Sequence, residues 1–341
     1  MTFSPLTIRR LKNFRSNKRG YYSTLIFCVL FFISIFAEFI ANDKPIFVFF
    51  EQKIHFPVFE KISETFYGGE FETEADYKDP YVRDLINKKG FFIMPPIEYS
   101  YDTINYDLRV PSPSPPTLEN LLGTDDQGRD VLARLIYGFR ISVFFGLTLT
   151  ILSSFIGILA GGVQGFYGGR IDLLIQWLIN VFWSIPTLLL VISISIALGS
   201  GFWQIFIAIG LTMWVEVARV TRGEVLKLRE LSYIKAVKSI GFNDYKIITN
   251  HILPNILNPI IIISTANFAT AILLEAGLSF LGLGIQPPAP SWGMMIKNHY
   301  LYILIDDPYL AILPGLCIVI LVLSFMSLGN VLRDIKDVKL K

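Results

Sequence analysis

The chain has 341 residues, of which 52% are hydrophobic, and its mean hydropathy is +0.52. A soluble domain of this length would not need so many apolar residues, and long apolar runs indicate membrane spans. The net charge is only +2, so the charge balance gives no reason to expect a nucleic-acid partner. The uneven distribution of charge along the chain is instead a signal of membrane topology.

The residues that would support catalysis or metal binding are missing or scattered. Cys28 and Cys317 both lie in apolar runs and predict no disulfide framework, and the three histidines, at 55, 251 and 299, have no zinc-type spacing. The chain has no phosphate-binding loop of the form G-x-x-x-x-G-K-[ST]. We therefore expect no enzyme activity and no cofactor in this chain, and if ATP drives it, another chain hydrolyses the ATP.

The amino-terminal part predicts a basic segment followed by a first span. Residues 1–20 carry six basic side chains and no acidic one, and residues 21–41 are almost continuously apolar. A cleaved signal peptide has an apolar core of only about 7–15 residues, so we interpret 21–41 as an uncleaved span. The basic start places the amino terminus in the cytoplasm.

Residues 42–118 form an insert of different character, rich in polar, aromatic and acidic residues and without a spanning run. The charge rule places this insert outside the cytoplasm, in the periplasm of a Gram-negative cell. The Pro-rich string RVPSPSPP predicts an extended linker that returns the chain to the membrane. We expect a small cap whose aromatic side chains pack its own core.

The core region, residues 119–341, begins with a loop that leads into an amphipathic helix. Thr124 or Asp125 is expected to cap the helix, and Asp126 complements its amino terminus. The string LGTDDQGRDV predicts an interfacial segment with an anchoring role. Its candidate site residues are Gly123, Thr124, Asp125, Gly128, Arg129 and Asp130.

Five further spans are predicted in the core region, which makes six in all. They cover about 143–163, 173–198, 202–220, 259–278 and 310–332. Walking the spans alternately puts 164–172, 220–256 and both termini on the cytoplasmic side, where most Lys and Arg lie. Pro186 is expected to kink the third of the six. A glycine-rich string is expected to form a tight turn: Gly161, Gly162, Gly165, Gly168 and Gly169.

Charged residues in or near the spans deserve a functional interpretation by default. Glu275 is expected near the outer end of its span, and Glu216 and Arg219 near the inner end of theirs. Since none is predicted at a bilayer centre, a proton relay is disfavoured. Trp292 is expected in an interfacial turn on the outer side.

Residues 232–255 are the most informative stretch, because they form a basic, helix-like insert between two apolar runs. We expect two short helices broken at 241–243, with Gly241 in a left-handed turn and Asn243 or Asp244 as the next cap. Tyr233, Ile234 and Phe242 would be hydrophobic anchors for a groove on a partner. Pro254 and Pro259 are expected to interrupt the helix where the chain re-enters the bilayer. The alternative is a basic loop held by anionic lipids.

This stretch resembles the cytoplasmic coupling loop of ATP-binding-cassette (ABC) importer permeases. The family loop has an alanine pair, a glycine and a distal Leu-Pro, and here Ala236, Gly241, Leu253 and Pro254 occupy those places. Lys235 replaces the usual Glu and Val237 the second Ala. The resemblance implies that an ATPase docks on Tyr233, Lys235, Ala236, Gly241, Phe242, Asp244, His251, Leu253 and Pro254.

The strings at 121–142 and 272–293 are similar to the dipeptide, oligopeptide and nickel branch of these permeases, in its C-type subunit. The insert and the strings around it resemble the oligopeptide/microcin C type. The resemblance implies an all-α polytopic membrane protein of the type I importer fold, with six spans and a periplasmic insert. It implies a multi-pass subunit of the bacterial inner membrane that imports peptides or peptide-like compounds.

The implied partners are a second permease, two cytoplasmic ATPases that bind the ATP, a periplasmic solute-binding protein and the peptide, with no nucleic acid. Three alternatives stay open. A nickel importer would need metal ligands, which the binding protein rather than this chain could supply. An ion-coupled secondary transporter predicts mid-bilayer ionisable residues and internal repeats. A membrane scaffold or sensor would not need the coupling loop.

Overall fold

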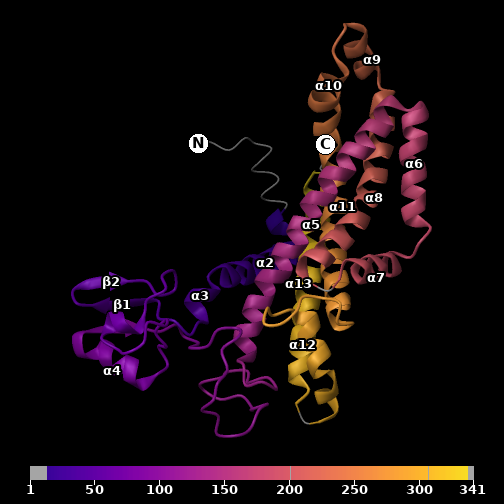
Figure 1. Cartoon of the computed structure of the whole chain (residues 1–341). Helices are drawn as coiled ribbons and strands as arrows, with labels where there is room; N and C mark the ends of the chain where they lie inside the picture. The colour runs from indigo at the N-terminus through magenta and orange to yellow at the C-terminus, as the bar shows by residue number, and fades with distance from the viewer. Residues whose placement is uncertain (1–13, 200, 306, 337–341) are drawn as a thin grey trace. The chain divides into compact units, whose positions relative to one another are not determined.

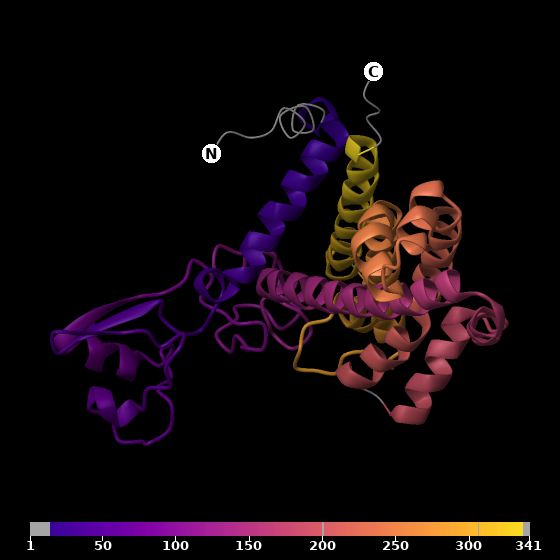
Figure 2. The ribbon, with the colours of Figure 1, turned by 90° about the horizontal axis from the view of Figure 1, so that it is seen from above.

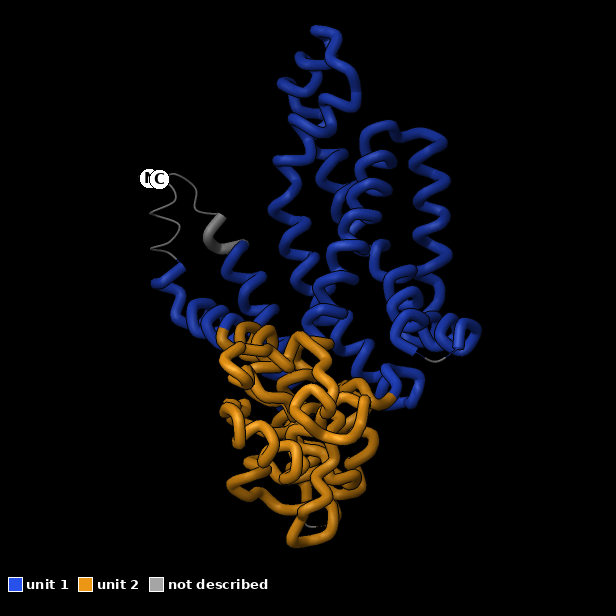
Figure 3. The backbone as a smooth tube through the Cα atoms, turned by 60° about the vertical axis from the view of Figure 1, so that its left-hand side comes forward, with its two compact units in different colours: residues 1–28, 142–286, 315–341 blue, residues 29–141, 287–314 orange. Residues whose placement is uncertain are grey.

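A computed structural model describes residues 14–199, 201–305 and 307–336, with side chains as far as residue 332. The expected basic segment 1–20 lies mostly outside this range, as do Lys339 and Lys341. The chain forms two compact units (Figure 3). Unit 1 comprises residues 1–28, 142–286 and 315–341, and unit 2 comprises 29–141 and 287–314.

Unit 1 contains most of the long helices, and α2, α5 and α13 continue from it into unit 2 (Figure 1). The helices of unit 1 and these shared helices are α2 (Lys18–Ile35), α5 (Val131–Tyr167), α6 (Gly169–Trp183), α7 (Thr187–Leu198), α8 (Phe202–Arg229), α9 (Ser232–Ser239), α10 (Asp244–Ile247), the π-helical turn η2 (Ile248–Ile252), α11 (Leu253–Phe280) and α13 (Tyr309–Lys336).

Within the described residues, five helical stretches are long and apolar enough to cross a membrane: α2, α5, α8, the stretch from α10 to α11, and α13. The pair α6 and α7 adds a sixth span if it counts as one. The predicted helical fold with six spans is confirmed on this count. The amphipathic helix expected before the span at 143–163 and that span itself form one helix, α5, which begins at 131.

The predicted kink at Pro186 is a full break. The helices α6 and α7 meet at an angle of 86°, and Ser184–Pro186 separate them. Proline has no amide hydrogen and its ring clashes with the preceding turn, so α6 cannot continue through this position. Pro186 becomes the residue before α7, where its fixed φ of −55° suits a helix start.

The predicted glycine turn is wrong for three of its five residues. Figure 2 shows α5 as one unbroken helix, and Gly161, Gly162 and Gly165 lie inside it. Only Gly168 and Gly169, with φ of +69° and +56°, make the turn into α6. Gly161 has a different reason to be glycine, because a Cβ there would lie 2.3 Å from the Ala218 carbonyl oxygen of α8.

The interior of unit 1 is built around α8, which packs along α7 and α11. Phe145 and Leu149 of α5, Ile205 and Ile209 of α8 and Ala271 of α11 are all fully buried in one cluster. Burying such side chains stabilises the bundle by about 1.5–3 kcal/mol each. These contacts hold α8 and α11 together as one body.

Unit 2 contains the only strands in the described part of the chain. Its elements are α3 (Ala37–Ile40), β1 (Phe47–Phe50), β2 (Lys53–His55), η1 (Glu64–Tyr67), α4 (Pro80–Lys89), β3 (Gly90–Ile93), α12 (Trp292–His299) and η3 (Tyr300–Leu304). The strands form an antiparallel sheet in the order β2-β1-β3. Val48 and Phe50 pack with Tyr67, Tyr77 and Ile86 in a small core.

Trp292 lies in a helix and not in a turn as expected. Its side chain is 1% exposed, it begins α12, and its Nε1 donates to the Leu135 carbonyl oxygen at 3.2 Å. The Trp292 ring also fills the space beside Gly138, where a Cβ would lie 2.6 Å from Nε1. Trp292 therefore joins α12 to the first turns of α5 inside unit 2.

Candidate functional site

The coupling segment, which we define as residues 232–255, folds as two short helices joined by a tight turn. Gly241 has φ +92°, a value that glycine adopts without strain, and it ends the turn after α9. The Asn243 side chain accepts a hydrogen bond from the Tyr245 amide at 3.2 Å and so caps α10. The predicted pair of helices, the glycine turn and the Asn243 cap are all present.

The segment does not break again at its prolines. From α10 the chain passes through η2 into α11 without leaving the helix, and Pro259 lies inside α11. The prediction that Pro254 and Pro259 interrupt the helix is therefore wrong. The wider π turn precedes Pro254, where an ordinary α turn would meet the proline ring and lack its amide donor.

One side of the coupling segment is fastened to unit 1. Ile234 of α9, Ile247 of α10 and Ile252 are at most 2% exposed, and they pack in one cluster with Val225 of α8 and Ile256 of α11. Ile234 was expected to be a docking anchor, and the structure makes it a core residue instead. Any movement of α9 and α10 must therefore carry α8 and α11 with it.

The opposite side of the segment exposes apolar groups to solvent, and we call it the outer face. It consists of Tyr233, Ala236, Ile240, Phe242 and Tyr245, all exposed, with Ile240 at 76% and Tyr245 at 72%. These apolar side chains alternate along the segment with exposed Lys235, Lys238 and Lys246, and so many exposed large apolar groups in one short segment make it a candidate interaction site. The predicted residues Tyr233, Ala236 and Phe242 belong to it.

Ile240 and Tyr245 of the outer face were missed at the sequence level. A signal for Ile240 was available, because Tyr233, Ala236 and Ile240 have the i, i+3, i+7 spacing of one helix face. Ile234 lies one residue from Tyr233 and so turns to another side of the helix. The spacing alone separates the two faces but does not say which of them is buried.

The remaining predicted residues of the segment have local roles. Lys235 Nζ lies 2.9 Å from Glu230 Oε2, and this hydrogen bond lowers the pKa of Glu230. Asp244 lies in the first turn of α10, and the His251 ring stands 6.2 Å from that of Phe242. Leu253 packs against the core cluster, whereas Pro254 is exposed.

Two arginines of α8 bind this helix to its neighbours α5 and α6. Arg229 Nη1 donates to the Gly165 and Phe166 carbonyl oxygens at the end of α5, at 3.0 and 3.2 Å. Arg222 makes a two-pronged pair with Asp172 of α6, at 2.6 and 2.7 Å. These contacts satisfy orphan carbonyls of a helix end and fix α6 against α8.

The second predicted motif lies in unit 2, and we call residues 120–130 the Asp125 loop. Asp125 is fully buried, and its Oδ2 accepts from Arg129 Nε at 2.8 Å and lies 3.5 Å from Arg134 Nε. Its Oδ1 accepts from the Arg129 amide at 2.9 Å. Asp125 is thus the centre of a buried charge cluster inside the unit, and the predicted cap at Thr124 or Asp125 is wrong.

The cap of α5 is Asp130, whose Oδ1 accepts from the Ala133 amide at 2.7 Å and whose Oδ2 accepts from Asn120 Nδ2 at 2.8 Å. Burial raises the pKa of Asp130. Thr124 instead accepts from the Ser114 amide at 3.0 Å. Gly123 and Gly128 have φ of +73° and +80°, which explains glycine at both turns of the loop.

His299 joins α12 to this loop, where it contacts Asp126. Its Nδ1 lies 2.8 Å from the Met295 carbonyl oxygen and its Nε2 lies 3.0 Å from Asp126 Oδ1. The hydrogen bond from His299 lowers the pKa of Asp126.

A metal ion does not fit this cluster, although ligand atoms of Asp125, Asp126 and His299 lie within 4.8 Å of one another. The oxygens of Asp125 already accept hydrogen bonds from Arg129 and from two backbone amides. Two guanidinium groups beside it would also repel a cation. The cluster is a structural clasp of unit 2.

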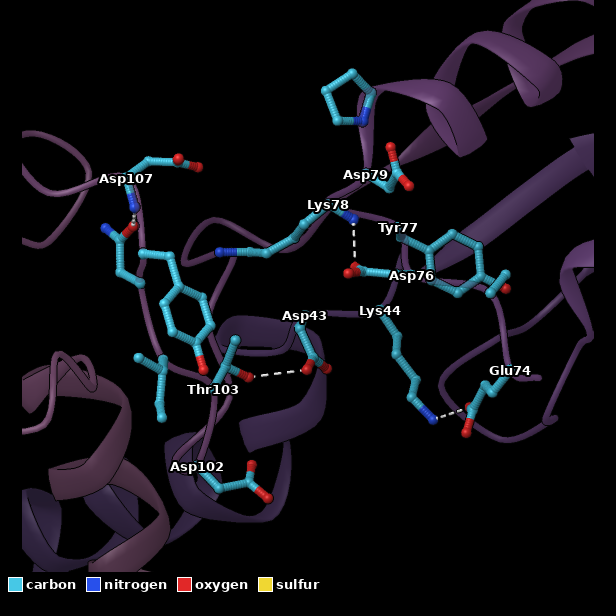
Figure 4. A pocket seen from close by; sticks show the side chains of 15 residues that line it. Asp43, Lys44, Glu74, Asp76, Tyr77, Lys78, Asp79, Asp102, Thr103 and Asp107 are labelled. Carbon is cyan, nitrogen blue, oxygen red and sulfur yellow. Dashed lines mark hydrogen bonds and ion pairs between the residues drawn. The ribbon is translucent and has the colours of Figure 1, made fainter. Parts of the chain in front are cut away.

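The insert holds an open cavity of about 690 Å³, which Figure 4 shows from close by. Six carboxylates and two lysines line it: Asp43, Glu74, Asp76, Asp79, Asp102, Asp107, Lys44 and Lys78. Lys44 pairs with Glu74, and Thr103 donates to Asp43 at 2.8 Å. Burial lowers the pKa of Lys78 to about 8, and its Nζ lies 3.0 Å from the centroid of the Tyr99 ring.

Comparisons with known proteins agree with this geometry. Residues 138–340 match the family described as "Binding-protein-dependent transport system inner membrane component". The chain is 39% identical to the Inner membrane ABC transporter permease protein YejE of Escherichia coli (strain K12), over 98% of this chain and 97% of that protein.

Two other relatives carry names that state a cargo. The Peptidoglycan transport system permease protein YejE of Agrobacterium fabrum (strain C58 / ATCC 33970) is 38% identical, over 98% of this chain and 93% of that protein. The Oligopeptide transport system permease protein OppC of Bacillus subtilis (strain 168) is 37% identical, over 71% of this chain and 78% of that protein. The match to the first of these includes the insert.

Proposed function

The chain belongs to the family of binding-protein-dependent transport system inner membrane components. From this premise we propose that it forms half of the translocation pathway of a peptide importer. It is a multi-pass inner-membrane permease, not an enzyme. Membership of the family implies an ATPase and a substrate-binding protein as partners. The proposal adds a second permease, two ATPase copies and a peptide as cargo.

The observation that carries the proposal is the outer face of the coupling segment. Its five side chains are exposed and uncharged, and Figure 1 shows α9 and α10 beyond the ends of α8 and α11. A helix with small Ala236 between Tyr233 and Ile240 suits a groove on a partner, where backbones approach closely. Anionic lipids would account for the exposed lysines of the segment but not for these exposed apolar groups, so the proposed occupant is an ATPase.

The proposed topology puts the coupling segment, both termini and the turn at 168–169 in the cytoplasm, and residues 42–118 in the periplasm. Its support is the distribution of basic residues, since the segment and the end of α8 carry Lys227, Arg229, Lys235, Lys238 and Lys246. The ATPases would then meet the outer face, and the binding protein would meet the other side of the membrane.

The proposed mechanism is alternating access driven by ATP in the partner subunits. Closure of the two ATPases moves the coupling segments that sit in their grooves. Because Ile234, Ile247 and Ile252 pack against α8 and α11, the movement passes to these helices as a rigid displacement. The Arg222 and Arg229 contacts extend the moving body to α6 and α5.

The proposed cargo is a peptide or a peptide-containing compound. Its support is the similarity to relatives named for peptidoglycan and for oligopeptide transport. These cargoes share peptide bonds and differ in the attached sugar. Peptidoglycan fragments and microcin C are both peptide-containing compounds, so one chemical class covers them.

The test is purification of the full complex from its native membrane with wild type and Ala236→Glu. We expect a second permease and ATPase subunits with wild type, and loss of the ATPase alone with Ala236→Glu, because the variant buries a charge in the groove. Leu118→Glu is the matched control, since Leu118 is 97% exposed in unit 2, and it should keep all partners.

Co-purification of the ATPase with Ala236→Glu at the wild-type ratio would show that the outer face is not the docking site. A wild-type chain that purifies without any ATPase would overturn the importer proposal as a whole. Uptake of radiolabelled tetra-alanine by vesicles that contain the complex tests the cargo separately.

A further inference from the structure

Unit 1 contains a cavity of about 270 Å³ beside the break between α6 and α7. Its walls come from the end of α6, the start of α7, and the middle of α8 and α11. The ends of α8 and α11 are both about 20 Å from these middle turns, at 1.5 Å per residue. A cavity beside a broken span is a candidate binding site for cargo.

The polar groups of the cavity are rich in hydrogen-bond acceptors. The Thr212 and Thr270 hydroxyls donate to the carbonyl oxygens of Ile209 and Ala266, at 2.8 and 3.1 Å, which leaves their oxygen lone pairs available. The Glu216 carboxylate can only accept when ionised. A ligand group with several N–H donors matches such a lining.

Glu216 lies midway along α8, which runs from Phe202 to Arg229. Within the described residues Glu216 has no ion-pair partner. Arg219 follows one turn later, but its guanidinium stacks on Trp183 of α6, 3.4 Å from the ring centroid.

Glu216 is an exposed carboxylate on a helix long and apolar enough to cross a membrane, and ionisable residues in such helices mark cargo or ion pathways. Asn267 of α11, 2% exposed, donates to the Met213 carbonyl oxygen at 3.3 Å and so holds α11 against α8 at the cavity. The cavity is therefore a built feature of two packed helices.

We infer that this cavity is a subsite of the translocation pathway in which Glu216 receives the ammonium group of a peptide's amino terminus. The inference rests on the proposed function and adds a chemical preference to it. The volume is just below the roughly 300–1,000 Å³ of ligand pockets, so it suits one end of a peptide rather than the whole molecule. The hydroxyls of Thr212 and Thr270 would accept from the remaining N–H groups.

The test compares wild type with Glu216→Gln in the full complex reconstituted in vesicles, with tetra-alanine as the cargo. We expect the ratio of peptide uptake to ATP hydrolysis to fall at least about tenfold, the scale of losing a hydrogen bond to a charged group. ATP hydrolysis stimulated by the loaded binding protein should persist, because the docking surface is intact. Glu216→Asp should retain intermediate uptake, since it keeps the charge.

The matched control is Glu224→Gln on the same helix, where Glu224 pairs with Lys227 at 2.7 Å outside the cavity. It should transport as wild type does. Equal uptake by Glu216→Gln and wild type would overturn the inference and leave the proposed function standing. If wild type takes up no tetra-alanine while the binding protein still stimulates hydrolysis, the peptide cargo and this inference both fail.

If Glu216→Gln does not assemble, a thiol-protection measurement tests whether the peptide occupies the cavity. With Cys28 and Cys317 replaced by Ala, Thr270→Cys places one thiol in the cavity. We expect tetra-alanine to slow its labelling by a water-soluble methanethiosulfonate during transport, but not labelling of the control Leu118→Cys, which is exposed outside the spans. Unchanged labelling of Thr270→Cys would contradict the inference.

Discussion

The coupling segment and the Asp125 loop are both polar motifs, yet their side chains are arranged in opposite ways. In the Asp125 loop the charges are inside, with Asp125 at 0% and Arg129 at 5% exposed. In the coupling segment Lys235 and Lys238 are exposed, and apolar Ile240 is 76% exposed. The comparison shows that the charges of the Asp125 loop stabilise its own fold, whereas the coupling segment leaves apolar side chains exposed to a partner.

The largest effect should come from breaking the loop's charge cluster with Asp125→Asn. The variant leaves the Arg129 and Arg134 guanidinium groups buried without their counter-ion, which should cost about 3–5 kcal/mol of unfolding free energy. Denaturant unfolding of the purified protein in detergent would measure it. Glu119→Gln, an exposed carboxylate of the neighbouring chain, should change stability by less than about 0.5 kcal/mol. Equal stability of both variants would mean that the cluster is not structural.

The next effect separates the two faces of the coupling segment. Ile234→Ala should cost about 2–5 kcal/mol, because Ile234 is 2% exposed in the core cluster. Ile240→Ala should leave stability unchanged and weaken ATPase binding about tenfold, as for an interface hot spot. Unfolding and ATPase titration of both variants should show the loss of stability in Ile234→Ala and the loss of ATPase binding in Ile240→Ala. The comparison breaks down if Ile240→Ala destabilises the chain as much as Ile234→Ala does.

A smaller effect should appear at Lys78 in the insert. Burial lowers its pKa from 10.5 to about 8, so between these values the unfolded chain holds more protons than the folded one. Stability of the insert should therefore rise as pH increases from about 8 towards 10.5, and the full penalty applies below 8. Amide exchange across residues 47–93 of the whole protein, corrected for its intrinsic pH dependence, measures this rise. Lys78→Met should abolish the rise, and a rise of the same size in that variant would assign it to another group.

The smallest effect is expected at the Arg222–Asp172 pair, which is partly exposed, at 32% and 19% of the side chains. Asp172→Asn should lower stability by about 1 kcal/mol or less. Its effect on transport should be larger, because the pair fixes α6 to α8 in the body that moves with the coupling segment. Uptake per ATP hydrolysed is the measurement, and Glu224→Gln, with its exposed local pair, is the control. Unchanged coupling in Asp172→Asn would remove α6 from the moving body.

Much of the architecture follows from local rules and was available in the sequence. The spans are apolar runs of sufficient length, and the turn at Gly241 and the cap at Asn243 follow from residue type alone. Helix ends were less accessible, because α5 and α8 continue past the apolar stretch into polar residues. A polar helix end is held by neighbours, as Arg229 holds the end of α5, and such contacts are not local.

The site residues also divide into those that the sequence predicts and those that only the tertiary structure places. By itself the sequence determined the family, through the coupling motif, and the membrane character, through hydropathy. Only the tertiary structure decided that Ile234 is core and Ile240 is surface, that Asp125 is a buried clasp, and that Glu216 lines a cavity. The physical reason is that burial and charge pairing depend on residues far apart in the chain, such as Asp126 with His299, which no local pattern brings together.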